Sequence, residues 1–454
     1  MKVLFVNPPV VRYNGKFNEH QINPRIALEN FAYKYQKVTG KFLNFWVRKW
    51  TRGMRYGVRA GSRWPWTLDH RVGAINYPFI MAYATAFLKS QGFDAHLIDA
   101  CAESEYSYKN FLTQVKDQKA DIVVVECSTP TLDIDLWISQ EISKFGKVAL
   151  AGPHLTEKTV KEIQEKNPHI AYFLKGEYIV SALEMAKTQM PGIYEPKVVT
   201  SNINDLPFPY RDYKCAAHYY DPSMPTARPQ LQILGSKGCP FECSFCMWPQ
   251  VMYGGKVALR DPEKIAQEIR ECIVKHNYKS IFFDDDTFNL GTERISKLCE
   301  HLKKIGLPWT MMGRLDCSPN WLYDKMVDSG CVGMRFGIET FNLEVLKNIN
   351  KKLERIDFQK QLEHITNVHP QLMIHLTMMK NMPGQTEEIH KNDMQILKEL
   401  GYFPDNPMRS YQLSNCVPFP GTKLYDDLMK SKDPAILNQY NLYDGGQETV
   451  MAKI

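Results

Sequence analysis

The sequence predicts an α/β protein with two domains, each built around a parallel sheet. Short apolar runs alternate with helical patterns through both halves of the chain, which is typical of parallel α/β architecture. The length of 454 residues exceeds the limit of about 250–300 residues at which single cores stop growing. Hydrophobic residues make up 44% of the chain, which favours a globular protein over a disordered one.

The first domain, expected over residues 1–190, reads as a doubly wound sheet of five strands. The first strand, 2–7, ends at two prolines, and the β-branched run at 121–126 predicts a buried strand. Further strands are expected at 95–99, 148–152 and 170–174, with helices at 77–91, 108–116, 133–144 and 157–165. Ligands of such sheets bind at the carboxyl ends of the strands. These ends carry Asn7, Pro8, Pro9, Asp99, Ser128, Thr129, Pro130, Gly152, His154, Gly176 and Glu177.

Residues 191–230 lack periodicity and are rich in Pro, Asn, Asp and Tyr, so they are expected to form a linker. Strand and helix then alternate six times over residues 231–425, before a short tail at 426–454. The strands are expected at 231–236, 280–285, 309–315, 333–340, 373–378 and 411–415, and the helices begin near Pro262, Thr292, Asn320, Leu343, Arg355 and Thr386. Six units are too few to close a full eight-stranded barrel.

A basic, aromatic insertion interrupts the first domain at about 34–68. It contains nine Lys or Arg residues, no acidic residue, and four of the eight tryptophans of a chain with a net charge of +6. Such a patch can bind nucleic acid or lie on a membrane surface. The favoured alternative is an insertion that packs over a neighbouring domain and covers the cleft between the two domains, because no RNA-specific feature accompanies it.

The cysteine content and the N-terminus indicate a cytoplasmic protein. Eleven cysteines, an odd number scattered over a long chain, argue against a secreted disulfide framework. No apolar run approaches the ~18 residues of a membrane span. The N-terminal apolar run is short and is broken by prolines, unlike a signal peptide.

The strongest motif of the chain comprises Cys239, Cys243 and Cys246, in the stretch GCPFECSFCMWP. The spacing C-x3-C-x2-C places three thiolates on one short loop. Thiolates hold iron–sulfur clusters, normally four to a cubane, so a triplet leaves one iron open to a small molecule. The alternative is a zinc site, which would need a fourth Cys or His in tetrahedral geometry.

With Phe245 before the last cysteine, this motif resembles the radical S-adenosylmethionine (SAM) superfamily. The resemblance implies a partial (β/α)6 barrel, a 4Fe-4S cluster on the three cysteines, and SAM bound to the open iron. The reduced cluster would cleave SAM to a 5′-deoxyadenosyl radical, which removes a hydrogen from an unactivated carbon. It also implies a small-molecule substrate and an electron donor such as flavodoxin or ferredoxin.

The resemblance places further SAM contacts at the ends of later strands. Asp284, Asp285 and Asp286 replace a Gly-Gly-Glu-like motif; adjacent carboxylates repel one another unless a cation is near, and the alternative is a solvated acidic turn. Arg314 is expected to hold the SAM carboxylate by two hydrogen bonds, unless it is structural. Glu339 resembles the ribose-contacting acid of the family, or it caps the helix near Leu343.

Two further segments resemble family motifs. Pro383 and Gly384 belong to a segment similar to G-L-P-G-E-T that approaches the adenosine. Asn381 and Met382 stand there in place of Gly-Leu, so the strand end is expected to turn less tightly. The segment PFPGT at 418–422 resembles one found in cobalamin-associated members.

A parallel domain ahead of the barrel resembles the cobalamin-binding radical SAM enzymes, which include C-methyltransferases and the anaerobic ring-forming enzyme of bacteriochlorophyll synthesis. The resemblance implies that cobalamin contacts residues at the strand ends: Pro8, Pro9, Ser128, Thr129, Pro130, Gly152, His154, Gly176 and Glu177. The D-x-H-x-x-G motif is absent, because Asp94 and His96 lie on the second strand without the glycine. His154 would line the cofactor pocket or be satisfied within its own loop.

The sequence therefore predicts an enzyme that uses a 4Fe-4S cluster, SAM and cobalamin to methylate or rearrange an unactivated carbon, with methyl transfer favoured. One alternative is a cobalamin-free radical dehydratase or oxidoreductase, in which side chains fill the first domain's pocket and Cys331 or Tyr253 donates a proton. A second is an RNA-binding or membrane-surface protein with a structural cluster. It is disfavoured because a structural cluster would have four protein ligands, so nucleic acid is not an expected partner.

Overall fold

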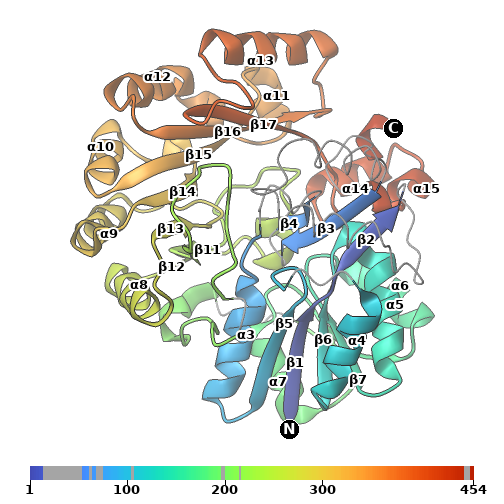
Figure 1. Ribbon diagram of the computed structural model, residues 1–454. Coiled ribbons are helices and arrows are strands. Elements are labelled where there is room, and N and C mark those ends of the chain that lie inside the picture. The colour runs from blue at the N-terminus through green and yellow to red at the C-terminus, as the bar shows by residue number, and fades with distance from the viewer. Residues whose placement is uncertain are drawn as a thin grey trace, which may run out of the picture.

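The computed structural model describes residues 1–13, 54–60, 64–67, 75–103, 107–195, 200–213, 216–443 and 450–454. Most of the basic insertion at 34–68 lies outside the described residues. Two parallel sheets of six strands each organise the described part of the chain, which confirms the predicted α/β class. Figure 1 shows the first sheet in the lower half of the molecule and the second at the upper left.

The first sheet has the strand order β5-β1-β6-β7-β8-β9, with every neighbouring pair parallel. The strand order reverses between β1 and β6, as in a doubly wound fold, and ligands bind at such reversals. The strands are β1 (Lys2–Asn7), β5 (Asp94–Asp99), β6 (Ile122–Glu126), β7 (Lys147–Ala151), β8 (Ile170–Leu174) and β9 (Gly192–Tyr194). The sixth strand, β9, lies in the segment expected to be a linker. With three residues it is too short to show a hydrophobic period.

Helices cover both faces of the first sheet. Val3 and Phe5 of β1 pack in one hydrophobic core, and Leu4 and Val6 pack in another, as expected from the two-residue period of a strand. The first core is completed by α3 (Phe79–Ser90) and α7 (Ile179–Thr188), the second by α4 (Tyr108–Asp117), α5 (Leu132–Ser143) and α6 (Glu157–Lys166).

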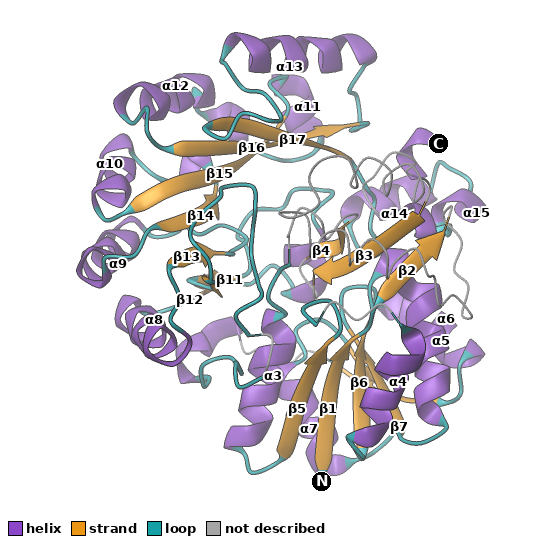
Figure 2. Ribbon diagram, viewed as in Figure 1, coloured by secondary structure: helices purple, strands orange, loops and turns teal. Residues whose placement is uncertain are grey.

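The second sheet keeps its strands in chain order, with β10 and β17 at its edges. Its parallel strands are β10 (Gln230–Ile233), β13 (Ser280–Phe283), β14 (Trp309–Gly313), β15 (Cys331–Glu339), β16 (Met373–Lys380) and β17 (Arg409–Asn415). The connecting helices are α8 (Pro262–His276), α9 (Thr292–Ile305), α10 (Asn320–Asp328), α11 (Leu343–Asn348), α12 (Phe358–Val368) and α13 (Glu387–Glu399). Helix α12 begins after Arg355, because the side chain of Asp357 caps it. Figure 2 shows helices in an arc outside these strands.

The two faces of the second sheet differ in polarity. Met334, Phe336 and Ile338 of β15 belong to the core between the sheet and its helices. The residues that alternate with them, which include Arg335 and Glu339, therefore face the other side. That face is polar in the neighbouring strand as well, where His375 alternates with core residues of β16.

Two further parts of the chain lie at the strand ends of the first sheet. The strands β2 (Val10–Tyr13), β3 (Met54–Ala60) and β4 (Trp64–Thr67) form a small antiparallel sheet, and β4 contacts the short helix η2 (Thr129–Thr131). After β17, the chain forms α14 (Lys423–Met429), α15 (Pro434–Leu437) and η7 (Tyr440–Leu442). η7 also contacts η2, so the segment expected as a tail packs against the first domain.

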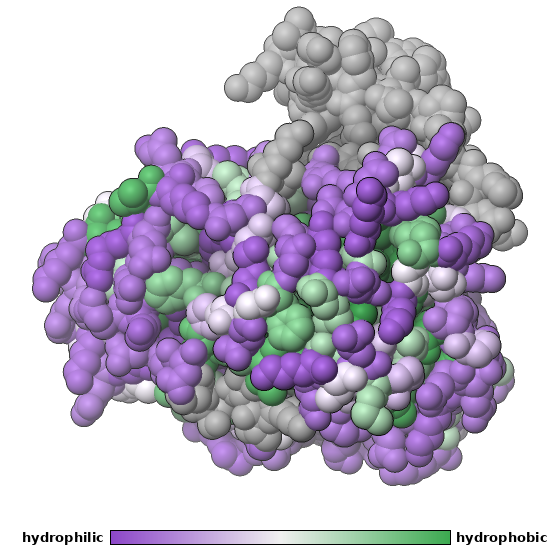
Figure 3. Space-filling view, turned by 90° about the horizontal axis from the view of Figure 1, so that it is seen from below, coloured by the Kyte–Doolittle hydropathy of each residue, from purple (hydrophilic) through white to green (hydrophobic). Residues whose placement is uncertain are grey.

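Among the described residues, no helix is long and apolar enough to cross a membrane. The face seen in Figure 3 is mostly hydrophilic, with hydrophobic residues in scattered patches. This agrees with helices that turn their polar sides outward over both sheets.

Candidate active site

The three cysteines lie on a loop after the first strand of the second sheet. This cysteine loop, residues 238–247, is flanked by the short strand β11 (Ser236–Lys237) and by η4 (Trp248–Met252), one turn of π-helix. Gly238 begins the loop with φ of +77°, and a Cβ atom there would lie 2.1 Å from the carbonyl oxygen of Lys256. Only glycine therefore fits the first position of the loop.

The thiols lie close enough to influence one another. Burial raises the pKa of Cys246, and the thiols of Cys243 and Cys239 raise it further. No three His, Cys, Asp or Glu side chains of the described ranges converge closely enough to hold a single metal ion. Zinc holds each sulfur about 2.3 Å from the metal, so its ligands must crowd together. Three thiols on one loop are the ligand type of an iron–sulfur cluster, and a cluster at this loop stays a prediction.

The acidic triplet after β13 accepts hydrogen bonds from the residues that lead into the cysteine loop. Asp285 accepts hydrogen bonds from the backbone N–H of Gly235 (2.9 Å) and from the hydroxyl of Ser236 (2.6 Å). Asp286 accepts one from the N–H of Gly238 (3.1 Å). Asp284 and Asp285 are fully buried and Asp286 is half-buried, so the triplet is not a solvated turn. A SAM contact of the triplet stays a prediction.

Gln250 of η4 fixes the backbone of the cysteine loop from the other side. Its amide nitrogen donates to the carbonyl oxygens of Cys246 (2.8 Å) and Cys243 (3.0 Å), while its oxygen accepts from the N–H of Lys423 (2.8 Å) at the start of α14. Sequence reasoning missed this residue. Its one signal is the four-residue spacing from Cys246, about one helical turn.

Arg314 contacts the cysteine loop rather than standing free. Its guanidinium lies 3.6 Å from the ring centroid of Phe241, and its Nη1 is 4.0 Å from the sulfur of Cys243. Nε and Nη2 donate to both carboxylate oxygens of Asp316, at 2.9 and 2.7 Å. Asp316 thus occupies the Nε–Nη2 edge, and Nη2 also donates to the carbonyl of Lys351 at 2.8 Å. A contact of Arg314 with the SAM carboxylate stays a prediction.

Glu339 ends β15 with φ of +67°, and Lys351 donates a hydrogen bond of 2.8 Å to its carboxylate. Both side chains are buried. Burial lowers the pKa of Lys351, but Glu339 and Cys243 raise it more, so the net direction is upward. The helix after Glu339 is capped by Asn342 instead, which removes the capping role considered for Glu339.

The segment around Lys351 also contacts the cysteine loop. The carbonyl of Ile349 accepts from the N–H of Ser244 (2.9 Å), and the side chain of Asn350 donates to the carbonyl of Glu242 (2.8 Å). In the sequence, Lys351 and Lys352 look like ordinary surface lysines. Only the fold shows that Lys351 is buried beside the site.

The strand end at Asn381 turns as tightly as glycine would allow, contrary to expectation. Asn381 adopts φ of +60°, a left-handed conformation that asparagine tolerates better than most residues. Gly384 follows with φ of +79°, and a Cβ atom there would lie 2.5 Å from the side-chain nitrogen of Asn348. Phe245 is partly buried against the core of the second domain. Adenosine contacts of Pro383 and Gly384 stay predictions.

At the strand ends of the first sheet, some of the buried polar side chains form hydrogen bonds with other side chains. Asp99 accepts hydrogen bonds from Asn7 and from the hydroxyl of Tyr219, both at 2.9 Å. Burial raises the pKa of Asp99 to about 6, although these hydrogen bonds lower it. Gly152 has φ of +120°, and a Cβ atom there would lie 2.4 Å from the carbonyl of Cys127, so the loops after β6 and β7 approach closely.

His154 is fully buried at the end of β7. Its Nδ1 lies 3.1 Å from the hydroxyl of Thr129, and the ring of Tyr440 from η7 packs edge-on at 4.8 Å. Burial lowers the pKa of His154 to about 3. Its Nε2 has no hydrogen-bond partner among the described residues. An unsatisfied buried nitrogen fits a polar ligand at this edge, whereas the packing of Tyr440 covers part of it.

The remaining predicted residues of the first domain also lie at this edge. Pro8, Pro9, Ser128, Thr129 and Pro130 are buried there. Glu177, by contrast, forms a buried ion pair with Lys237 next to the cysteine loop. Contacts of any of these residues with cobalamin stay predictions.

Of the two candidate proton donors, Cys331 lies away from the cysteine loop. It begins β15, at the end of the strand opposite to Glu339, and its side chain belongs to the helix-side core. Tyr253 is buried next to η4 and packs in the core of the first domain.

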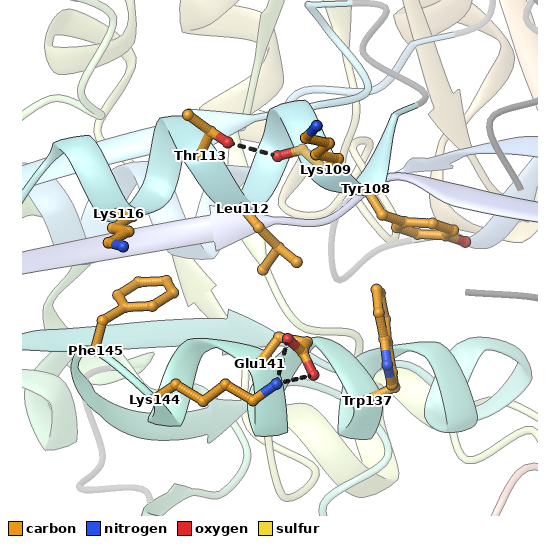
Figure 4. A pocket seen from close by; sticks show the side chains of 9 residues that line it. All are labelled: Tyr108, Lys109, Leu112, Thr113, Lys116, Trp137, Glu141, Lys144 and Phe145. Carbon is orange, nitrogen blue, oxygen red and sulfur yellow. Dashed lines mark hydrogen bonds and ion pairs between the residues drawn. The ribbon is translucent and has the colours of Figure 1, made fainter. Parts of the chain in front are cut away.

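A groove lies on the outer surface between α4 and α5 (Figure 4). It is lined by Tyr108, Lys109, Leu112, Thr113, Lys116, Trp137, Glu141, Lys144 and Phe145. Lys144 is paired with Glu141 there. None of the predicted site residues lines this groove, so it is separate from the strand ends and the cysteine loop.

The cysteine loop and most of the second sheet lie in a segment that resembles a known family. Residues 233–396 match the family model described as the radical SAM superfamily, and the relatives support an enzyme. The chain is 24% identical, over 78% of its length and 79% of the relative, to an uncharacterized methyltransferase of Pyrococcus horikoshii. It is 23% identical to a bacteriochlorophyllide d C-12(1)-methyltransferase of Chlorobaculum tepidum, over 68% of this chain and 66% of that one.

A solved structure shares the fold at low identity. The radical SAM methyltransferase TsrM of Kitasatospora setae, solved with cobalamin and a [4Fe-4S] cluster bound, aligns with a TM-score of 0.59 and 15% identity. The alignment covers 78% of this chain and 72% of TsrM. The chain therefore shares its fold with TsrM.

Proposed function

We propose that this enzyme transfers a methyl group to a carbon atom of a small molecule, using a 4Fe-4S cluster, SAM and cobalamin. The observation that carries the proposal is the position of the cysteine loop, at the junction between the second sheet and the strand ends of the first. Gly421 packs against Thr156 of the first domain and Val251 of η4 at this junction. A cofactor at either set of strand ends would lie beside the loop.

Cys239, Cys243 and Cys246 would hold the cluster, with SAM at the fourth iron. When bound, these groups supply one-electron cleavage of SAM, and cobalamin supplies methyl transfer; an electron donor such as flavodoxin or ferredoxin would provide the electron. The protein's own residues fix the loop. Gln250 holds its carbonyl groups. Arg314 provides a buried positive charge beside Cys243. That charge would offset part of the negative charge of a cluster held by the loop.

SAM would lie against the ends of β13, β15 and β16. Asp286 is the half-exposed member of the acidic triplet and suits the ammonium group of SAM. Glu339, fixed by Lys351, suits a ribose hydroxyl. The adenosine would lie near the left-handed turns at Asn381 and Gly384, whose backbone groups would contact it.

Cobalamin would lie at the carboxyl edge of the first sheet. The support is the close approach of the loops at Gly152, the unsatisfied Nε2 of His154, and the fold shared with TsrM. The strand β4 of the basic insertion contacts η2 at the same edge, which suits a cover over a bound group.

A cobalamin-free radical dehydratase or oxidoreductase is the second candidate. It is favoured by one observation: Tyr440 packs against His154, so a side chain of the protein fills part of the edge. Its substrate radical would then be quenched without methyl transfer.

The deciding experiment is anaerobic production with cobalamin supplied, followed by gel filtration and an absorption spectrum. Stoichiometric cobalamin after filtration is the expected result, and its loss with the iron–sulfur band intact would favour the second candidate. Cys243→Ala is expected to abolish both the cluster and 5′-deoxyadenosine formation. Normal iron content and turnover in that variant would overturn the proposal.

A further inference from the structure

The hydrophobic core of the first domain extends to both sides of the cysteine loop. Leu234 precedes the loop, and Met252 and Tyr253 follow it; all three belong to the same core as Tyr83 and Tyr178 of the first domain. The loop therefore rests on the first domain at its beginning and at its end. Its position depends on that domain as well as on the second sheet.

A single glutamate contacts both ends. Glu177 follows β8, and its carboxylate pairs with the ammonium group of Lys237, directly before Gly238. The backbone N–H of Glu177 donates to the carbonyl of Met252 at 2.9 Å, and Met252 is the last residue of η4, which follows the loop. The side chain thus holds one flank and the main chain holds the other.

This contact is enclosed. Lys237 and Glu177 are 2% and 3% exposed, and the Lys237 ammonium lies 4.9 Å from the ring centroid of Tyr83 in α3. Two charges removed from water gain little net stability from pairing, because desolvation offsets their attraction. Removal of one partner leaves the other buried and uncompensated, which is strongly unfavourable. Such a pair therefore fixes the position of one segment relative to the other more than it raises the free energy of unfolding.

We infer that Glu177 and Lys237 are positioning residues, which hold the cysteine loop in a fixed place relative to the strand ends of the first sheet. The inference rests on the proposed function, since it assigns the loop to the cluster. It gives Glu177 a role different from a cobalamin contact. It also makes the end of β8 the physical connection between the two cofactor sites.

The test uses the full-length enzyme, reconstituted anaerobically with iron and sulfide. Glu177→Gln, Lys237→Met and the double variant are compared with the wild type. Glu177→Asp keeps the charge and shortens the side chain. Asp221→Asn is the matched control: Asp221 forms a buried pair with Arg335, and its other hydrogen bonds within the described ranges go to Ser223 and Gln230. The readouts are the melting temperature of the apoprotein, iron retention against a chelator, and the electron paramagnetic resonance (EPR) spectrum of the reduced cluster.

Both single variants are expected to melt at lower temperature and to retain iron about 10- to 100-fold less well, as for other residues that orient metal ligands. The double variant should recover the melting temperature without recovering iron retention or the wild-type EPR spectrum. Glu177→Asp should melt near the wild type and still alter the spectrum. Asp221→Asn should lower the melting temperature alone.

Two results would overturn the inference. Recovery of both melting temperature and iron retention in the double variant would make the pair merely structural. Wild-type iron retention and EPR spectra in the single variants would remove any role at the loop. A wild-type protein that assembles no cluster would instead refute the proposed function, and this inference with it.

Discussion

Lys351 donates a hydrogen bond of 2.8 Å to Glu339 at the point where β15 ends, and both side chains are buried. The pair lies beside the cysteine loop, since the neighbouring Ile349 accepts a hydrogen bond from Ser244. Loss of the Glu339 carboxylate would therefore affect Lys351 as well as a bound ribose. Glutamine is a better test at this position than alanine, because it preserves volume and leaves an oxygen to accept from Lys351.

Glu339→Gln is expected to weaken SAM binding about tenfold, the effect of losing one charge-assisted hydrogen bond of ~1.4 kcal/mol. Iron content should stay at the wild-type level. Anaerobic calorimetry with SAM measures the affinity. Glu344→Gln, an exposed position on α11, is the control. Unchanged SAM affinity in Glu339→Gln would remove its ribose role.

Gln250→Ala is expected to lower cluster retention, because the carbonyl groups of Cys243 and Cys246 lose their donor. An unsatisfied buried polar group costs about 1–3 kcal/mol. Iron content after gel filtration measures the effect. Gln267→Ala removes an exposed glutamine of α8 and should retain full iron content. Equal iron in both variants would show that Gln250 does not support the loop.

Gly238→Ala is expected to displace the cysteine loop, because its Cβ atom would collide with the carbonyl of Lys256. Gly254→Ala is a matched control: Gly254 also has a positive φ, +56°, but no atom lies within 4 Å of its Cβ position. Left-handed backbone costs alanine about 1–2 kcal/mol at either site. Only Gly238→Ala should lose cluster binding as well as stability, as measured by thermal melting and iron content. Similar losses in both variants would show that φ alone matters.

Arg314→Lys should impair the cluster even though it keeps the charge. Lysine cannot stack flat on Phe241 while donating two hydrogen bonds to Asp316. The EPR spectrum of the reduced cluster is expected to change, with lower iron content. Arg270→Lys, at an exposed pair with Glu263, should leave both unchanged. A wild-type spectrum for Arg314→Lys would mean that charge alone is required.

His154 should make the apoprotein acid-sensitive. Burial lowers the pKa of His154 to about 3, whereas an unfolded histidine binds a proton below about 6.5. The unfolded state therefore binds more protons between these values, and stability falls as pH falls from 6.5. Between pH 6.5 and 5 the loss is about 2 kcal/mol. His154→Gln should lose less stability over the same interval in urea unfolding. An equal loss in both proteins would contradict a buried neutral histidine.

Much of the fold could be predicted from the sequence because its signals are local. The buried strands β1 and β6 and the helices that begin at Pro262, Thr292 and Asn320 follow from hydrophobic periods within a few positions. At Pro262 the capping residue Asp261 adds a second local signal. The short strand β9 was not predicted, because three residues are too few to show a hydrophobic period. The turn at Asn381 was misjudged because asparagine, like glycine, adopts a left-handed conformation.

The sequence by itself determined the α/β class with its parallel sheets. It also predicts the chemistry of the site, because three cysteines at fixed spacing on one loop form a local pattern. Only the tertiary structure decided which distant residues meet that loop. Glu177 lies 60 positions before Lys237, and Gln250 lies 173 positions before Lys423. Such pairs form only where the parallel strands bring the ends of distant loops to the same edge of a sheet. The hydrophobic period of a segment predicts its own secondary structure and does not predict the polar partner of its loop.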